Sequence, residues 1–64
     1  MKKLGSRIVK LRESRGLSQA EVARRLYMER GNYSRIETGK TNPSIITLHK
    51  IAEVLEVDVK EMID

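Results

Sequence analysis

The sequence predicts an all-α fold, a compact bundle of five short helices, from three observations. Its 64 residues are enough for one small domain, which we expect to span residues 1–64. It has no cysteine, so neither disulfides nor a zinc site built on thiolates can stabilise the fold. Only two side chains are aromatic, and aliphatic residues recur at helical spacing, as expected for a core of packed helices.

The first helix is predicted over about residues 2–14. Leu4, Ile8 and Leu11 repeat at positions i, i+4 and i+7, which places them on one face of a helix. Gly16 follows this pattern and is expected to end the helix, because glycine adopts the left-handed backbone of a helix end at least cost.

The second helix is predicted over about residues 19–26. Ser18 and Glu21 have the spacing of a capping box, in which each side chain accepts a hydrogen bond from the backbone N–H of the other residue. The apolar residues that this helix is expected to bury are Ala20, Val22, Ala23 and Leu26.

The third helix is predicted over about residues 30–37, after a polar interruption of the apolar pattern. Tyr33 and Ile36 resume the helical spacing. Gly39 stands where a left-handed helix end is expected, and a loop over residues 40–43 follows.

The last third of the chain predicts two more helices. Ser44 is a suitable N-cap for a fourth helix of about eleven residues. Its expected apolar face consists of Ile45, Leu48, Ile51, Ala52 and Leu55. A turn is expected at residues 56–57. Asp58 and Glu61 repeat the capping pattern, so a short fifth helix should end at Ile63.

Basic residues are concentrated in the first part of the chain. Residues 1–40 carry eleven Lys and Arg against four Asp and Glu, whereas residues 41–64 carry two against five. This asymmetry favours a polyanionic partner, either nucleic acid or an anionic membrane. Nucleic acid and a cytoplasmic location are preferred, because the basic residues are spread over three short helices and no apolar run reaches the length of a membrane span or signal segment.

Residues 19–37 have the form of a helix-turn-helix unit, whose second helix fits a DNA major groove. At about 100° per residue, the inward half of that second helix carries Tyr33, Ile36 and Glu37. The outward half carries Arg30, Gly31, Ser34, Arg35 and Thr38. Arginine donates two hydrogen bonds to O6 and N7 of guanine, so this face suits base reading. By helical spacing alone, a solvated polar face is the alternative.

Four segments of the chain carry a joint pattern. They are residues 16–23 (GLSQAEVA), 33–40 (YSRIETGK), 42–44 (NPS) and 48–52 (LHKIA). Together they resemble the Cro/C1-type (XRE) helix-turn-helix family. The resemblance implies a five-helix, lambda-repressor-like domain and a sequence-specific transcription regulator, a repressor or controller protein of a bacterium or phage that binds a double-stranded DNA operator.

The resemblance also implies roles for individual residues. The positions that face bases are Arg30, Gly31 and Arg35, with Asn32 and Ser34 beside them. The positions that contact the DNA backbone are Gln19, Thr38 and Lys40. Gln19 is also expected to brace the third helix; an ordinary N-terminal helix residue is the alternative. Arg12 and Glu37 match a pair that the family uses as a salt bridge between the first helix and the end of the third; two independent surface charges are the alternative.

Two residues depart from the family pattern. Tyr27 replaces the usual glycine of the turn, so the turn is either not left-handed or strained. Glu29 replaces the usual Ser or Thr before the third helix, where it is expected to cap weakly and to favour the helix through its charge.

The sequence offers no catalytic, metal or cofactor site. His49 is the only histidine and has no cysteine or second histidine to complete a ligand set. Glu53 and Glu56 are spaced like a carboxylate pair, but no apolar surroundings separate their pKa values. We therefore expect no enzyme activity and no cofactor.

A homodimer is expected, because one small domain makes too few base contacts for useful specificity. Surplus apolar residues in the acidic C-terminal third are candidates for its interface: Ile46, Val54, Val57, Val59 and Ile63. Packing of all of them inside one domain is the alternative. Contact with RNA polymerase is a further expectation. The competing functional hypothesis is a protein-binding module, such as an antitoxin or adaptor that binds a toxin-like protein, with DNA binding secondary.

Overall fold

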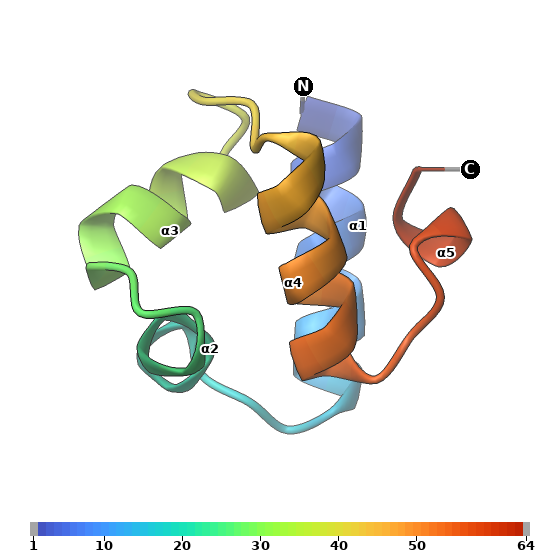
Figure 1. Ribbon diagram of the computed structural model, residues 1–64, viewed down its shortest axis with the longest axis horizontal. Helices are drawn as coiled ribbons and strands as arrows, with labels where there is room; N and C mark the ends of the chain where they lie inside the picture. The colour runs from blue at the N-terminus through green and yellow to red at the C-terminus, as the bar shows by residue number, and fades with distance from the viewer. Residues whose placement is uncertain (1, 64) are drawn as a thin grey trace.

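The computed structural model describes residues 2–63 and, of Lys2, the backbone alone. All regular secondary structure in this range is helical, as predicted. The five helices are α1 (Lys2–Ser14), α2 (Gln19–Arg25), α3 (Arg30–Glu37), α4 (Ile45–Leu55) and α5 (Lys60–Ile63). In Figure 1, α4 lies in front of α1, with α2 and α3 on one side and α5 on the other.

The helices surround one core made almost entirely of aliphatic side chains. α1 packs against α3 and α5, and α2 packs against α3 and α4. The core residues are Leu4, Ile8, Val22, Ala23, Leu26, Tyr33, Ile36, Leu48, Ile51, Ala52, Leu55 and Met62. Each of the five helices contributes at least one of them, so none is an appendage to the fold.

Two residues predicted to be buried are exposed. Ala20 is exposed because α2 turns Val22, Ala23 and Leu26 toward the core, and Ala20 lies about 200° around the helix from Val22. Ile45 is 65% exposed, because it occupies the first position of α4, one turn before Leu48, the first buried residue of that helix.

The N-caps are close to those predicted. Ser44 Oγ accepts a hydrogen bond from the Thr47 N–H at the start of α4. Before α5, Glu61 accepts from the Asp58 N–H. At α2, Ser18 Oγ accepts from the Glu21 N–H, but the Glu21 carboxylate accepts from Arg24 and Arg25. Only one of the two hydrogen bonds of the predicted capping box is therefore present among the described side chains. The Glu21 carboxylate, which would make the second, is bound by arginines on the next turn of the helix.

Four helices end in the same left-handed turn. The residues with positive φ are Gly16, Tyr27, Gly39 and Glu56, at 70°, 58°, 80° and 58°. In each turn the next N–H donates to a carbonyl of the last helical turn; the four bonds are Leu17 to Arg12, Met28 to Ala23, Lys40 to Arg35 and Val57 to Ala52. This is the Schellman motif, which satisfies carbonyls that a helix end leaves free. The ends predicted at Gly16 and Gly39 and the turn at residues 56–57 are thus confirmed.

Candidate nucleic-acid interface

The turn between α2 and α3 is left-handed, which decides between the two alternatives that the sequence left open. Tyr27 has a φ of 58°, and the Met28 N–H donates to the Ala23 carbonyl oxygen at 2.9 Å. A tyrosine in this conformation is strained, since left-handed backbone costs about 1 to 2 kcal/mol for a residue with a Cβ. Its side chain is 97% exposed, so packing within the described domain does not compensate for the strain.

Glu29 does not cap α3 as predicted. It occupies the N-cap position with extended backbone, but its side chain makes no capping hydrogen bond with the described first turn. A glutamate side chain is longer than the Ser, Thr or Asp that fit this geometry. The first N–H groups of α3 therefore have no side-chain cap from Glu29 and remain suited to an external acceptor such as a phosphate.

The two faces of α3 are arranged as the helical spacing predicted. Tyr33, Ile36 and Glu37 are buried against the core. The predicted outward residues are exposed, except that Ser34 is half-buried; the exposed ones are Arg30, Gly31, Arg35 and Thr38, and Asn32 beside them is exposed too. The inward residues anchor α3 while the outward ones remain available to a ligand.

The predicted salt bridge between Arg12 and Glu37 is present, with Glu37 buried and Arg12 half-buried. Arg12 Nε donates to Glu37 Oε2 at 2.6 Å, and Arg12 Nη2 donates to Glu37 Oε1 at 3.2 Å. The side chains of the pair are 11% and 2% exposed. Arg12 Nη1 also donates to the Leu17 carbonyl oxygen at 2.8 Å. Because the contact is bidentate, it fixes the orientation of α1 relative to the end of α3.

Gln19 joins the same cluster from the start of α2. Its Nε2 donates to Glu37 Oε1 at 2.8 Å, so one carboxylate receives hydrogen bonds from α1 and α2. Burial alone would raise the pKa of Glu37, but hydrogen bonding, with that from Arg12 the largest, outweighs it and holds the pKa below its ordinary value. Glu37 is therefore kept ionised and ties α1 and α2 to α3.

The Tyr33 hydroxyl lies in this cluster without a hydrogen bond of its own. The side chain is fully buried, and among residues 2–63 its hydroxyl oxygen has no hydrogen-bond partner. Burial, with the nearby Glu37 carboxylate, raises the pKa of Tyr33 far above its ordinary value. The ring fills the core, and the phenol stays neutral.

The residues predicted to contact the DNA backbone lie at two ends of the helix-turn-helix unit. Gln19 is half-buried and uses its amide nitrogen on Glu37. Thr38 and Lys40 are both exposed after α3, and the Thr38 hydroxyl donates to the Arg35 carbonyl oxygen at 3.3 Å. The structure thus brings Gln19 to the buried cluster and leaves Thr38 and Lys40 at the surface beyond it.

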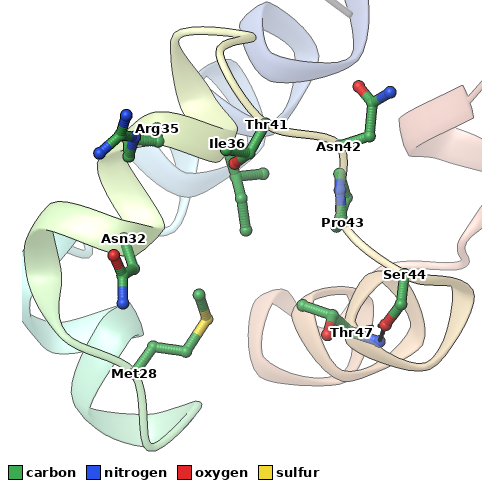
Figure 2. A pocket seen from close by; sticks show the side chains of 9 residues that line it. All are labelled: Met28, Asn32, Arg35, Ile36, Thr41, Asn42, Pro43, Ser44 and Thr47. Carbon is green, nitrogen blue, oxygen red and sulfur yellow. Dashed lines mark hydrogen bonds between the residues drawn. The ribbon is translucent and has the colours of Figure 1, made fainter.

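An open groove of about 410 Å³ lies between α3 and the start of α4. In Figure 2, Met28 and Ile36 point into it, while the Arg35 guanidinium at its rim points away. The full lining is Met28, Asn32, Arg35, Ile36, Thr41, Asn42, Pro43, Ser44 and Thr47. The polar wall formed by Thr41, Asn42 and Thr47 was not predicted from the sequence. The chain's only proline, at the centre of that wall, was the available signal for a rigid loop.

The apolar residues proposed for a dimer interface divide into two groups. Ile46 and Ile63 are 65% and 59% exposed. Val54, Val57 and Val59 are half-buried and pack against the core, so much of their surface is already used within the domain. Ile46 on α4 and Ile63 on α5 are the ones available to a second molecule.

Over residues 2–63, no group of three or more His, Cys, Asp or Glu side chains is arranged to hold a metal ion. Within the same range, no helix has the length and apolar character needed to cross a membrane.

Residues 8–62 match the model of a protein family described as helix-turn-helix. The chain belongs to the helix-turn-helix family. This helix-turn-helix protein is 39% identical, over 98% of its own length and 83% of the relative's, to the uncharacterized HTH-type transcriptional regulator y4dJ of Sinorhizobium fredii (strain NBRC 101917 / NGR234). The resemblance inferred from the sequence motifs is thereby confirmed.

Solved structures of other helix-turn-helix proteins share the fold. The crystal structure of the restriction-modification controller protein C.AhdI from Aeromonas hydrophila gives a TM-score of 0.90 at 31% identity, covering 95% of this chain and 92% of that one. SinR, the master regulator for biofilm formation, was crystallised in complex with DNA; that structure gives a TM-score of 0.87 at 37% identity, covering 95% of this chain and 98% of that one. The predicted five-helix fold is confirmed.

Proposed function

We propose that this helix-turn-helix protein is a sequence-specific, double-stranded DNA-binding transcriptional regulator that inserts α3 into the major groove. One observation carries the proposal: α3 anchors Tyr33, Ile36 and Glu37 in the core and turns Arg30 and Arg35 outward. The SinR structure with DNA and the relatives named as transcriptional regulators support it. A regulator of this kind acts by binding and needs neither a catalytic group nor a cofactor.

The outward residues divide into two kinds of contact. We assign base contacts to Arg30, Gly31, Asn32, Ser34 and Arg35, which lie along the outer side and groove edge of α3. Gln19, Thr38 and Lys40 are assigned to phosphates. Such contacts position the domain without reading sequence, because phosphates are the same at every base pair.

Two copies acting together would bind a palindromic operator. A homodimer places two recognition helices in successive major grooves about 34 Å apart. Exposed Ile46 and Ile63 on α4 and α5 support an interface formed by these helices. Bound at a promoter in the cytoplasm of a bacterium, such a dimer would regulate transcription by excluding RNA polymerase or contacting it.

The proposed base contacts are tested by comparing three alanine variants on two DNA duplexes. The specific duplex comes from selection out of a random library, and the other has unrelated sequence. Arg30→Ala and Arg35→Ala should cost roughly 1 to 3 kcal/mol on the specific duplex and little on the other, whereas Lys40→Ala should weaken both alike. Equal losses on both duplexes from the α3 variants would show that α3 does not read bases.

A protein partner is a second candidate, supported by Tyr27. This side chain is 97% exposed on a strained turn, and packing within the described domain gives no reason for a tyrosine there. The partner under the antitoxin or adaptor hypothesis is a toxin-like protein, whereas contact with RNA polymerase belongs to the DNA-bound regulator. Tyr27→Gly should leave DNA affinity unchanged and reduce partner binding. Loss of DNA affinity instead would assign Tyr27 to the DNA interface.

A further inference from the structure

Three basic side chains on α1 are used neither by the fold nor by the proposed DNA contacts. Four of the other basic residues between positions 3 and 40 are in ion pairs: Arg12, Arg15, Arg24 and Arg25. Three more belong to the DNA contacts proposed above: Arg30, Arg35 and Lys40. The three that are left all lie on α1 and are called the α1 basic row: Lys3, Arg7 and Lys10.

The α1 basic row occupies one side of its helix. Its members are spaced i, i+4 and i+7, so at about 100° per residue they fall within about 60° of one another. Lys3 and Lys10 are exposed, and Arg7 is half-buried. Among residues 3–63, whose side chains the structure describes, none of the three is in a salt bridge. Their charges are therefore available to an external anion.

The α1 basic row faces away from α3. Two residues mark the side of α1 that meets α3. An added Cβ on Gly5 would lie 2.2 Å from the Glu37 carbonyl oxygen, and Arg12 pairs with the Glu37 carboxylate. At about 100° per residue, Gly5 and Arg12 lie within about 20° of each other and about 180° around the helix from the middle of the row. α1 therefore separates the row from α3 and from a duplex held on the outward face of α3.

Neighbouring charges leave this side of α1 positive. The one acidic residue of α1, Glu13, lies about 60° around the helix from Lys10, the nearest member of the row. The helix α5 packs against α1 and adds one exposed charge of each sign, Lys60 and Glu61. Such a surface is complementary to a polyanion.

The surroundings of the row favour nucleic acid over a membrane. The large apolar side chains that are exposed in the described chain all lie outside α1: Tyr27, Ile45, Ile46 and Ile63. A helix that lies in a membrane surface needs such side chains beside its basic ones. The phosphate backbone of a duplex is bound through charge and needs no apolar contact.

We propose that the α1 basic row is a second DNA-binding surface, which holds the phosphate backbone of another duplex while α3 occupies the operator. The row spans about 10 Å, at about 1.5 Å per residue, so it contacts a short stretch of backbone and reads no sequence. The bridging of two duplexes rests on the function proposed above, whereas phosphate binding by α1 does not. A regulator with both surfaces would hold two segments of DNA together.

Titration of the operator-bound protein with a second duplex of unrelated sequence tests the proposal. Backbone amide NMR signals report where each duplex binds. Those of α3 should shift when the operator duplex is added, and those of residues 3–10 should shift only with the second duplex. Three phosphate contacts, at about −0.9 each, predict a slope of about −2.7 for log K of the second duplex against log salt concentration.

A double variant removes two charges of the row. Lys3→Gln with Lys10→Gln changes only exposed side chains and should leave the melting temperature and the operator affinity unchanged. It should weaken binding of the second duplex roughly tenfold or more and reduce the salt slope to about −0.9. Arg24→Gln with Lys50→Gln removes the same charge from exposed positions on α2 and α4 and is the matched control. It should leave binding of the second duplex unchanged.

Four results would overturn the proposal. The first is a second duplex that leaves the signals of residues 3–10 unmoved. The second is an operator duplex that moves them by itself and binds the double variant at positions 3 and 10 more weakly, which would place the row in the operator interface. The third is equal weakening by both double variants, which would assign the effect to net charge. The fourth is a shift with vesicles of anionic phospholipid and none with DNA, which would assign the row to a membrane surface.

The α3 signals test the function proposed above separately. If they do not respond to a duplex selected from a random library, that function fails, while the response of residues 3–10 to duplex DNA still decides whether the row binds phosphates. If they respond and residues 3–10 do not, the regulator is retained and the second surface is lost.

Discussion

Glu37 is a single residue on which the arrangement of three helices depends. Its carboxylate accepts hydrogen bonds from Arg12 on α1 and Gln19 on α2, while its backbone belongs to α3. Glu37→Gln leaves the half-buried Arg12 guanidinium without its carboxylate partner, so the free energy of unfolding should fall by about 3 kcal/mol. Urea denaturation measures this loss.

An exposed glutamate provides the control for that variant. Glu53 lies at the surface of α4, so Glu53→Gln should change the free energy of unfolding by less than about 0.5 kcal/mol. If Glu37→Gln lowered the free energy of unfolding by as little as this control, solvent would be replacing the Glu37 carboxylate as the hydrogen-bond partner of the Arg12 guanidinium.

The same carboxylate predicts a dependence of stability on pH. The pKa of Glu37 in the folded chain lies below the ordinary value of 4.5, so above that pH its full contribution to stability is present. As the pH falls through the lowered pKa, the contribution is lost. Below pH 4.5, the urea concentration at the unfolding midpoint should therefore decrease more steeply with falling pH for the wild type than for Glu37→Gln. Parallel pH profiles would contradict this assignment.

The sequence could predict only part of this cluster. The Arg12–Glu37 pair was predicted from the family resemblance, and helical spacing predicted that Glu37 lies on the inward half of the third helix. The resemblance also implied that Gln19 braces the third helix, but it did not name Glu37 as the acceptor, and local spacing gives no information on which side chains meet across 18 residues of chain. The buried hydroxyl of Tyr33 was missed for the same reason.

At the scale of the helices, four C-terminal turns share one conformation and differ in the residue that adopts it. Tyr27 and Glu56 occupy left-handed backbone that Gly16 and Gly39 occupy without strain. Tyr27→Gly should raise the free energy of unfolding by about 0.5 to 1 kcal/mol, since relief of strain exceeds the added entropy of the unfolded chain. Thermal denaturation measures the gain.

Gly39→Ala is the reverse control for this prediction. It places a Cβ on backbone with a φ of 80° and should lower the melting temperature. A lower melting temperature for Tyr27→Gly would indicate that the exposed ring stabilises the domain after all.

The contact between α1 and α3 has room for only a glycine. A Cβ on Gly5 would lie 2.2 Å from the Glu37 carbonyl oxygen and 2.8 Å from that of Ile36. Gly5→Ala should therefore cost about 2 kcal/mol or more, although alanine is the better helix former. Gly31→Ala, the matched change at an open site, should add up to about 1 kcal/mol of stability. Chemical denaturation of both variants compares them directly; a stabilised Gly5→Ala would show that the helices can move apart.

Helical spacing and turn residues predicted the order, type and approximate bounds of the helices. Ala20 was assigned to the wrong face of its helix, since it lies about 200° from Val22. Ile45 lies at a helix end, where periodicity shows which face a residue shares but not how far the neighbouring helices extend. The left-handed turn at Tyr27 remained open at the sequence level, because tyrosine disfavours a conformation that the surrounding hydrogen bonds require.

At the scale of the whole molecule, the proposed dimer predicts that disrupting its interface lowers both the molecular mass in solution and the affinity for the operator. Ile46→Lys with Ile63→Lys replaces two exposed apolar side chains, so the fold should be unaffected while a buried interface would be disrupted. Sedimentation should show the monomer mass, and binding to the palindromic duplex should weaken. Ser6→Lys, on the exposed face of α1, is the control for added charge and should do neither. An unchanged mass would locate the interface elsewhere or indicate a monomer.

The two faces of α3 also bear on how this chain can change over evolution or by design. Residues 33, 36 and 37 maintain the architecture, while residues 30, 31, 34 and 35 face outward and contribute nothing to the buried core. Substitutions at the outward positions therefore carry little risk for folding, and under the function proposed above a library confined to them is a route to reprogrammed DNA preference on an unchanged scaffold. On this one short helix, the residues that maintain the fold and the residues that face outward can therefore vary independently.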